Sequence, residues 1–62
     1  MNNIILIKER RAAEILGFSY SYLKSLRHKR GIRFVRVGKA IRYKLSDLHE
    51  FISERLVEIS SS

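Results

Sequence analysis

The spacing of apolar residues changes twice along this chain, and these changes constrain the fold more than any other feature. Before Gly31 the apolar residues recur at intervals of three and four, which is typical of amphipathic helices. Over residues 35–45 they alternate with Arg and Lys, which is typical of strands, and helical spacing returns after Ser46. In 62 residues these segments predict one small α+β domain.

The first helix is predicted over Glu9–Leu16. Its apolar positions are Ala12, Ala13, Ile15 and Leu16. Lys8 occupies the place where a capping Asp, Ser or Thr is expected, and Gly17 follows the last helical residue, as is common at a helix end. Residues 4–7 form either a short strand or a hydrophobic lead-in that folds onto the core, and we favour the lead-in.

A second helix is predicted over residues 20–29, with Ser19 as its N-cap. Leu23 and Leu26 face inward, and we expect Tyr22 to lie half-buried beside them. Phe18 fills the angle between the two helices. Two short helices joined by a turn that contains Gly form a helix-turn-helix.

The alternating segment predicts a β-hairpin with a short loop, Gly38-Lys39-Ala40. Its expected apolar face carries Val35, Val37, Ile41, Tyr43 and Leu45. Its expected basic face carries Arg36, Arg42 and Lys44. A basic hairpin beside a helix-turn-helix is a wing.

The last helix is predicted to begin after an N-cap at Ser46, with Asp47 near its positive N-terminal end. Its inward stripe comprises Leu48, Phe51, Ile52, Leu56 and Ile59. Another face carries Glu50, Glu54 and Glu58, and Val57 lies off the stripe, where it enlarges a patch for a partner or is simply exposed. We expect this helix to cover the core, and residues 59–62 to fray.

Positive charge is concentrated in the middle of the chain. Residues 8–44 contain twelve Lys and Arg against two Glu, whereas residues 45–62 contain one Arg against four acids. Such segregation favours contact with a polyanion over an ordinary solvated surface, on which both signs are mixed.

Several other classes of protein are disfavoured. The chain has no Cys, which excludes disulfide frameworks and thiolate metal sites. His28 and His49 fall in different elements, so neither a catalytic site nor a metal or cofactor site is predicted. No apolar run is long enough to span a bilayer or act as a signal peptide, and we expect a cytoplasmic protein that associates with the nucleoid through DNA.

The sequence resembles the MerR-like winged helix-turn-helix of the excisionase family, small DNA-binding proteins of phages and integrative elements. The resemblance is carried by residues 12–19 (AAEILGFS), 22–27 (YLKSLR), 35–43 (VRVGKAIRY) and 46–48 (SDL). It departs from the family at Lys8, where a Thr cap is usual, and at Arg10-Arg11, where Lys-Glu is usual. The resemblance implies that residues 1–62 form a single DNA-binding domain, with two helices, a hairpin wing and a C-terminal helix.

A helix of this kind enters the major groove, so the outward side chains of the second helix are predicted to contact base edges: Tyr20, Ser21, Lys24, Ser25 and His28. Cations around it are predicted to contact phosphates: Arg10, Arg11, Arg27, Lys29, Arg30 and Arg33. The wing residues Arg36, Gly38, Lys39 and Arg42 are predicted to approach the adjacent minor groove or its phosphates.

The expected partner is double-stranded DNA. The resemblance further implies an excisionase that bends DNA at an attachment site, acting with an integrase or other recombinase and with further copies of itself on adjacent sites. The alternatives are a small phage- or plasmid-type transcriptional regulator and, from other classes, an RNA-binding module or a protein-interaction adaptor.

Overall fold

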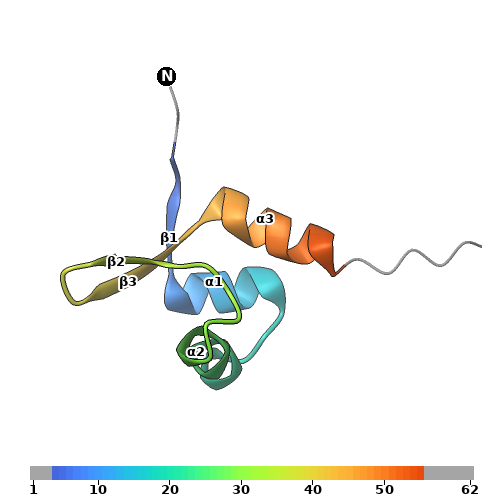
Figure 1. Ribbon diagram of the computed structural model, residues 1–62, viewed down its shortest axis with the longest axis horizontal. Coiled ribbons are helices and arrows are strands. Elements are labelled where there is room, and N and C mark those ends of the chain that lie inside the picture. The colour runs from blue at the N-terminus through green and yellow to red at the C-terminus, as the bar shows by residue number, and fades with distance from the viewer. Residues whose placement is uncertain (1–3, 56–62) are drawn as a thin grey trace, which may run out of the picture.

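The computed structural model describes residues 4–55, which form three helices and three strands. They follow in the order β1 (Leu6–Lys8), α1 (Glu9–Leu16), α2 (Tyr20–His28), β2 (Val35–Val37), β3 (Ala40–Lys44) and α3 (Leu45–Glu54) (Figure 1). The strands form one antiparallel sheet in the order β1-β3-β2. The fold is a small α+β winged helix-turn-helix, as predicted. Within residues 4–55 no helix has the length and apolar character needed to cross a membrane.

The predicted lead-in at residues 4–7 is wrong, because Leu6–Lys8 forms strand β1 along the free edge of β3. Ile7 pairs with Tyr43, and the carbonyl of Ile5 accepts a 2.9 Å hydrogen bond from the Leu45 N–H. Without β1 this edge of β3 would leave backbone groups unpaired. The pairing therefore gives the segment a regular structure that its few residues do not specify alone.

The corner between α1 and α2 forms as the sequence predicts. Gly17 takes a left-handed conformation (φ 74°), and the Phe18 N–H donates a 2.9 Å hydrogen bond to the carbonyl of Ala13. Ser19 caps α2, its hydroxyl oxygen accepting a 3.1 Å hydrogen bond from the Tyr22 N–H. Lys8 makes no side-chain cap for α1.

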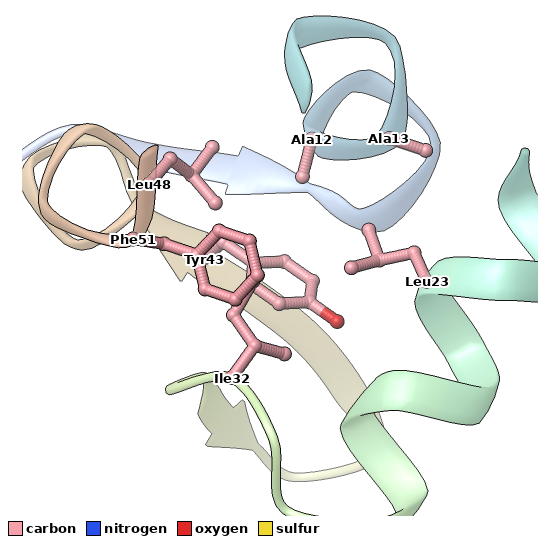
Figure 2. Packing of buried hydrophobic residues seen from close by; sticks show 7 residues of the cluster. All are labelled: Ala12, Ala13, Leu23, Ile32, Tyr43, Leu48 and Phe51. Carbon is pink, nitrogen blue, oxygen red and sulfur yellow. The ribbon is translucent and has the colours of Figure 1, made fainter. Parts of the chain in front are cut away.

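The core is built from all three helices, β3 and the segment that leads into β2. Its buried members are Ala12, Ala13, Leu23, Ile32, Tyr43, Leu48 and Phe51 (Figure 2). Ala12 and Ala13 are small, which lets α1 pack closely against its neighbours. Phe18 is half-buried and packs edge-to-face on Phe51, with ring centroids 6.3 Å apart, as expected for a residue that fills the helix corner.

The hairpin has a two-residue turn, Gly38-Lys39, rather than the predicted three-residue loop, because Ala40 pairs directly with Val37. Shortening the loop by one residue shifts the register, and a one-residue shift turns a strand's side chains to the other face. Arg36 consequently lies opposite Ile41, and Val35 lies opposite Arg42. The predicted division into an apolar and a basic face is therefore wrong for β2: Arg36 shares the core-side face, and Val35 and Val37 share the outer face.

Helix α3 begins two residues earlier than predicted, at Leu45, with Lys44 rather than Ser46 at the N-cap position and no side-chain cap. Ser46 is therefore inside the helix and is not its cap. Leu48 and Phe51 are buried as predicted, but Ile52 is 43% exposed and lies outside the core. The predictions for Leu56, Val57, Glu58, Ile59 and the tail 59–62 fall outside the described residues.

Candidate nucleic-acid interface

The outward face of α2 carries the side chains that the sequence assigns to base contacts. All of them are exposed, and they follow one another along the helix: Tyr20, Ser21, Lys24, Ser25 and His28. Leu23 lies on the opposite side and is fully buried. Helix α2 therefore presents a small, polar surface with one Lys, and its opposite side is fixed in the core.

A cluster of two cations and one aromatic ring stands at the N-terminal end of this face. The guanidinium carbon of Arg10 lies 4.4 Å from the centre of the Tyr20 ring, and the Lys24 Nζ atom lies 5.5 Å from the same point. These are cation–π distances. Tyr20 thus links Arg10, on α1, to the outward face of α2, so that both helices of the helix-turn-helix contribute charge to one surface.

Arg27 is the main correction among the predicted phosphate contacts. Its side chain is only 11% exposed, and its Nε atom donates a 2.7 Å hydrogen bond to Oε2 of Glu9. A second donor, Nη2, lies 3.4 Å from Oε1 of the same carboxylate, and the guanidinium lies over the Phe34 ring. Arg27 therefore acts inside the domain, where it joins α2 to α1.

Tyr43 completes this group, since its hydroxyl donates a 2.7 Å hydrogen bond to Glu9 Oε2. Figure 2 shows the Tyr43 hydroxyl directed from the sheet toward α2. Glu9, Arg27 and Tyr43, which we call the buried triad, thus connect α1, α2 and β3. No buried side-chain nitrogen or oxygen of the described residues lacks a hydrogen-bond partner.

The triad changes the ionisation of its members. Burial alone would raise the pKa of Glu9, but hydrogen bonds from Arg27 and Tyr43 outweigh burial and leave the pKa below its usual value. The bond to Glu9 raises the pKa of Arg27. Burial, and then the bond to the Glu9 carboxylate, raises the pKa of Tyr43. At neutral pH the triad is a stable carboxylate–guanidinium pair with a neutral phenol.

The triad was not predicted from the sequence, although one signal for it exists. Glu9 is one of only two acids within the basic segment 8–44. An acid in a surface that binds polyanions repels the ligand, so its presence there indicates an internal partner. The other acid, Glu14, is exposed and pairs with Arg11 at 2.8 Å.

A shallow hollow lies between the C-terminal end of α2 and strand β2. It is lined by Arg27, His28, Arg30, Phe34 and Arg36. Arg36 reaches it because the observed register puts it on the core-side face of the hairpin. No acidic side chain lines this hollow among residues 4–55. It continues the cationic surface from α2 to the wing, and we call it the basic hollow.

Arg42 lies on the opposite face of the sheet from Arg36, which corrects the prediction that the two share a face. It stands opposite Lys8 on one side and Val35 on the other, and its Nη1 donates a 2.8 Å hydrogen bond to the carbonyl of Ile41. Lys39 is exposed at the hairpin turn, beside Gly38. A left-handed φ of 62° at Gly38 allows this turn to be tight.

The remaining predicted residues differ in their surroundings. Lys29 and Arg30 are exposed at the end of α2. Arg33 is exposed but turned toward α3, where its Nη1 lies 3.6 Å from Oε1 of Glu50; exposed pairs of this kind contribute little to stability. Tyr22, predicted to be half-buried, is 53% exposed and packs edge-to-face on Phe18, with centroids 4.8 Å apart.

Comparison with known proteins gives a match over residues 10–56 to the family described as "Helix-turn-helix domain". The match runs from Arg10 in α1 past the end of α3, and it covers well over half of the chain. This chain belongs to the helix-turn-helix domain family. No curated protein and no solved structure gives a match.

Membership assigns a role to the surface described above. In a helix-turn-helix domain the second helix lies in the major groove of double-stranded DNA and reads base edges there. That helix is α2, and its exposed face is the one that bears Ser21, Lys24 and Ser25. The helix-turn-helix domain is therefore a sequence-specific DNA-binding module.

Proposed function

We propose that this helix-turn-helix domain is an accessory protein of a mobile DNA element, an excisionase that binds and bends DNA at an attachment site. The observation that carries this proposal is the position, in the fold, of the segments that resemble excisionases. Residues 12–19, 22–27 and 35–43 form the α1–α2 corner, α2 and the hairpin, which are the elements that border the candidate interface. The likeness thus extends to the DNA-facing elements as well as to core positions.

The proposed docking follows from the shape and charge of this surface. Helix α2 enters the major groove, and its outward residues, Lys24 foremost, contact base edges. The basic hollow then faces the phosphates between the major groove and the adjacent minor groove, with Arg36 on its wing side. Lys39 and Gly38 at the hairpin turn approach the minor groove.

Bending follows from engaging two grooves with one small rigid body. A wing that enters the minor groove while α2 occupies the major groove favours DNA that curves toward the protein, and the cost of curvature depends on sequence. One domain of this size covers a short site, so we propose that several copies bind adjacent sites and that a recombinase recognises the resulting curved assembly. The domain acts by binding, without catalysis.

An excision assay tests this proposal against the alternative of a transcriptional regulator. The purified chain is added to the recombinase of the same element and to DNA that carries its attachment sites, and the excised circle is measured. We expect circle formation to depend on the chain, and a permuted-site gel to show bending. The matched control is Lys24→Ala, which removes an exposed side chain outside the core and should lower circle formation without unfolding the domain. Repression of a promoter reporter with no stimulation of excision would contradict the proposal and favour the regulator.

A further inference from the structure

The backbone is strained at the junction between α2 and the strand that follows it. Arg30 has φ 61°, and it is the one non-glycine residue with positive φ among residues 4–55. Its N–H donates a 2.9 Å hydrogen bond to the carbonyl of Arg27, and the Gly31 N–H donates one of 2.9 Å to the carbonyl of Leu26. This pair of bonds defines the common C-terminal cap of a helix, in which the left-handed position is usually glycine. A side chain there is costly.

The glycine of this segment stands one residue later and serves another purpose. Gly31 does not have a positive φ. A Cβ atom added to it would lie 2.7 Å from the Cδ1 atom of Leu26, so the absence of a side chain lets the chain pass close to α2. Packing therefore accounts for Gly31, whereas nothing in the cap accounts for Arg at position 30.

The fold gains no visible interaction from the Arg30 side chain. Within residues 4–55 its guanidinium takes part in none of the side-chain hydrogen bonds or ion pairs. The exposed Arg30 residue lines the basic hollow together with Arg36 and His28, and it also borders a second hollow beside α3 that contains Asp47, Glu50 and Glu54. Arg27, which also lines the hollow, is largely buried and already neutralised by Glu9. Arg30 and Arg36 are consequently the Arg side chains of the hollow that no acid of the described residues neutralises.

We propose that Arg30 is a phosphate-binding residue, retained in a strained conformation because its guanidinium must stand where α2 meets the wing. Backbone strain that the fold does not need is typical of functional positions. The ligand is one phosphate of the DNA backbone, held jointly by Arg30 and Arg36 as the strand passes from α2 to the hairpin. This inference rests on the proposed DNA binding. It implies that Arg30 lowers the stability of the free domain while it raises the affinity for DNA.

Arg30→Gly tests the inference because strain and binding then change in opposite directions. We expect the melting temperature of the free chain to rise by a few degrees, since glycine adopts this φ without strain. We expect affinity for a short DNA duplex at low salt to fall about tenfold, as for the loss of a hydrogen bond to a charged group. The slope of log K against log salt should decrease by about 0.9, the value for one phosphate.

Two further variants serve as controls. Arg30→Lys keeps charge and strain, so it should retain most of the affinity and show no rise in melting temperature. Arg33→Ala removes an equal charge nearby, but from a side chain that faces Glu50, and should change affinity less than Arg30→Gly does. Equal DNA affinity for Arg30→Gly and the unchanged chain would overturn the inference, and so would a lower melting temperature. Absence of duplex binding by the unchanged chain would instead overturn the proposed function.

Discussion

Lys24 and Arg27 lie about one turn apart on α2, yet their side chains have opposite surroundings. The Lys24 side chain is exposed, with Nζ 5.5 Å from the centre of the Tyr20 ring. The Arg27 guanidinium is buried against Glu9 and Tyr43. A count of charges treats these two cations alike, whereas the structure leaves Lys24 exposed and uses Arg27 inside the fold. The same contrast separates Arg36 from Arg42 on the hairpin.

The largest expected effect is the loss of stability in Arg27→Ala. The substitution leaves the Glu9 carboxylate buried without its charged partner, which typically costs about 3–5 kcal/mol. Most of the stability of so small a domain would be lost. Urea unfolding followed by circular dichroism measures this cost. The matched control, Lys24→Ala, should change the free energy of unfolding by no more than about 0.5 kcal/mol. Equal losses in the free energy of unfolding for Arg27→Ala and Lys24→Ala would contradict the assignment of Arg27 to the fold and of Lys24 to the exposed surface.

Next in size is the effect of Lys24→Ala on DNA recognition. A duplex selected from random sequences by the unchanged chain should bind the variant more weakly by about 1–3 kcal/mol, because a base contact is lost. Binding to unselected DNA should change much less. Fluorescence anisotropy at one salt concentration compares the two duplexes. Equal losses on both would show that Lys24 contacts phosphate rather than base edges.

The comparison of Arg36 with Arg42 on the hairpin predicts a smaller loss of DNA affinity, and one that depends less on DNA sequence. Arg36→Ala should weaken binding to selected and unselected DNA alike, and should reduce the slope of log K against log salt by about 0.9. Arg42→Ala should do less, because Arg42 lies on the other face of the sheet. Salt titrations of both variants provide the measurement. A larger effect for Arg42→Ala would mean that the outer sheet face meets the DNA.

The smallest expected effect is a loss of stability at acid pH, which arises when Glu9 is protonated. The folded-state pKa of Glu9 lies below its unfolded value, about 4.3. The triad's contribution is therefore complete above that pH and is lost as the pH falls through the folded pKa. Tyr43 has the opposite sign: its raised pKa implies stability that is present below about pH 10 and lost as the pH rises further.

Thermal melts between neutral and acid pH compare the unchanged chain with Glu9→Gln. The variant is less stable at neutral pH, and the difference should narrow as acid protonates Glu9 in the unchanged chain. A difference that stays constant down to strongly acid pH would contradict the assignment of Glu9 as an ionised member of the triad.

Local signals made much of this fold predictable. Gly17 and Ser19 define the α1–α2 corner through a left-handed turn and a side-chain cap. Both interactions involve only residues that are close in the sequence. The outward face of α2 follows equally from helical periodicity. The exposure of Ser21, Lys24 and Ser25 was therefore predictable, because it depends on one helix and one buried side.

The errors arose where distant segments meet. Strand β1 exists because β3 offers it an edge, and the side of the sheet on which Arg36 lies depends on a single residue in the turn length. Arg27 and Glu9 are 18 residues apart, and periodicity does not indicate that they pair. Tertiary contacts between distant segments therefore decide which cations are exposed and which are paired inside the domain.

We expect the outward face of α2 and the basic hollow to contact the DNA, whereas the triad and α3 should not. An NMR titration of the isotopically labelled chain with the selected duplex tests this directly. The largest changes in chemical shift should fall at Ser21, Lys24, Ser25 and Arg36, with small ones at Glu50 and Glu54 on α3. Changes concentrated on α3, with the outward face of α2 unaffected, would contradict this mode of DNA binding.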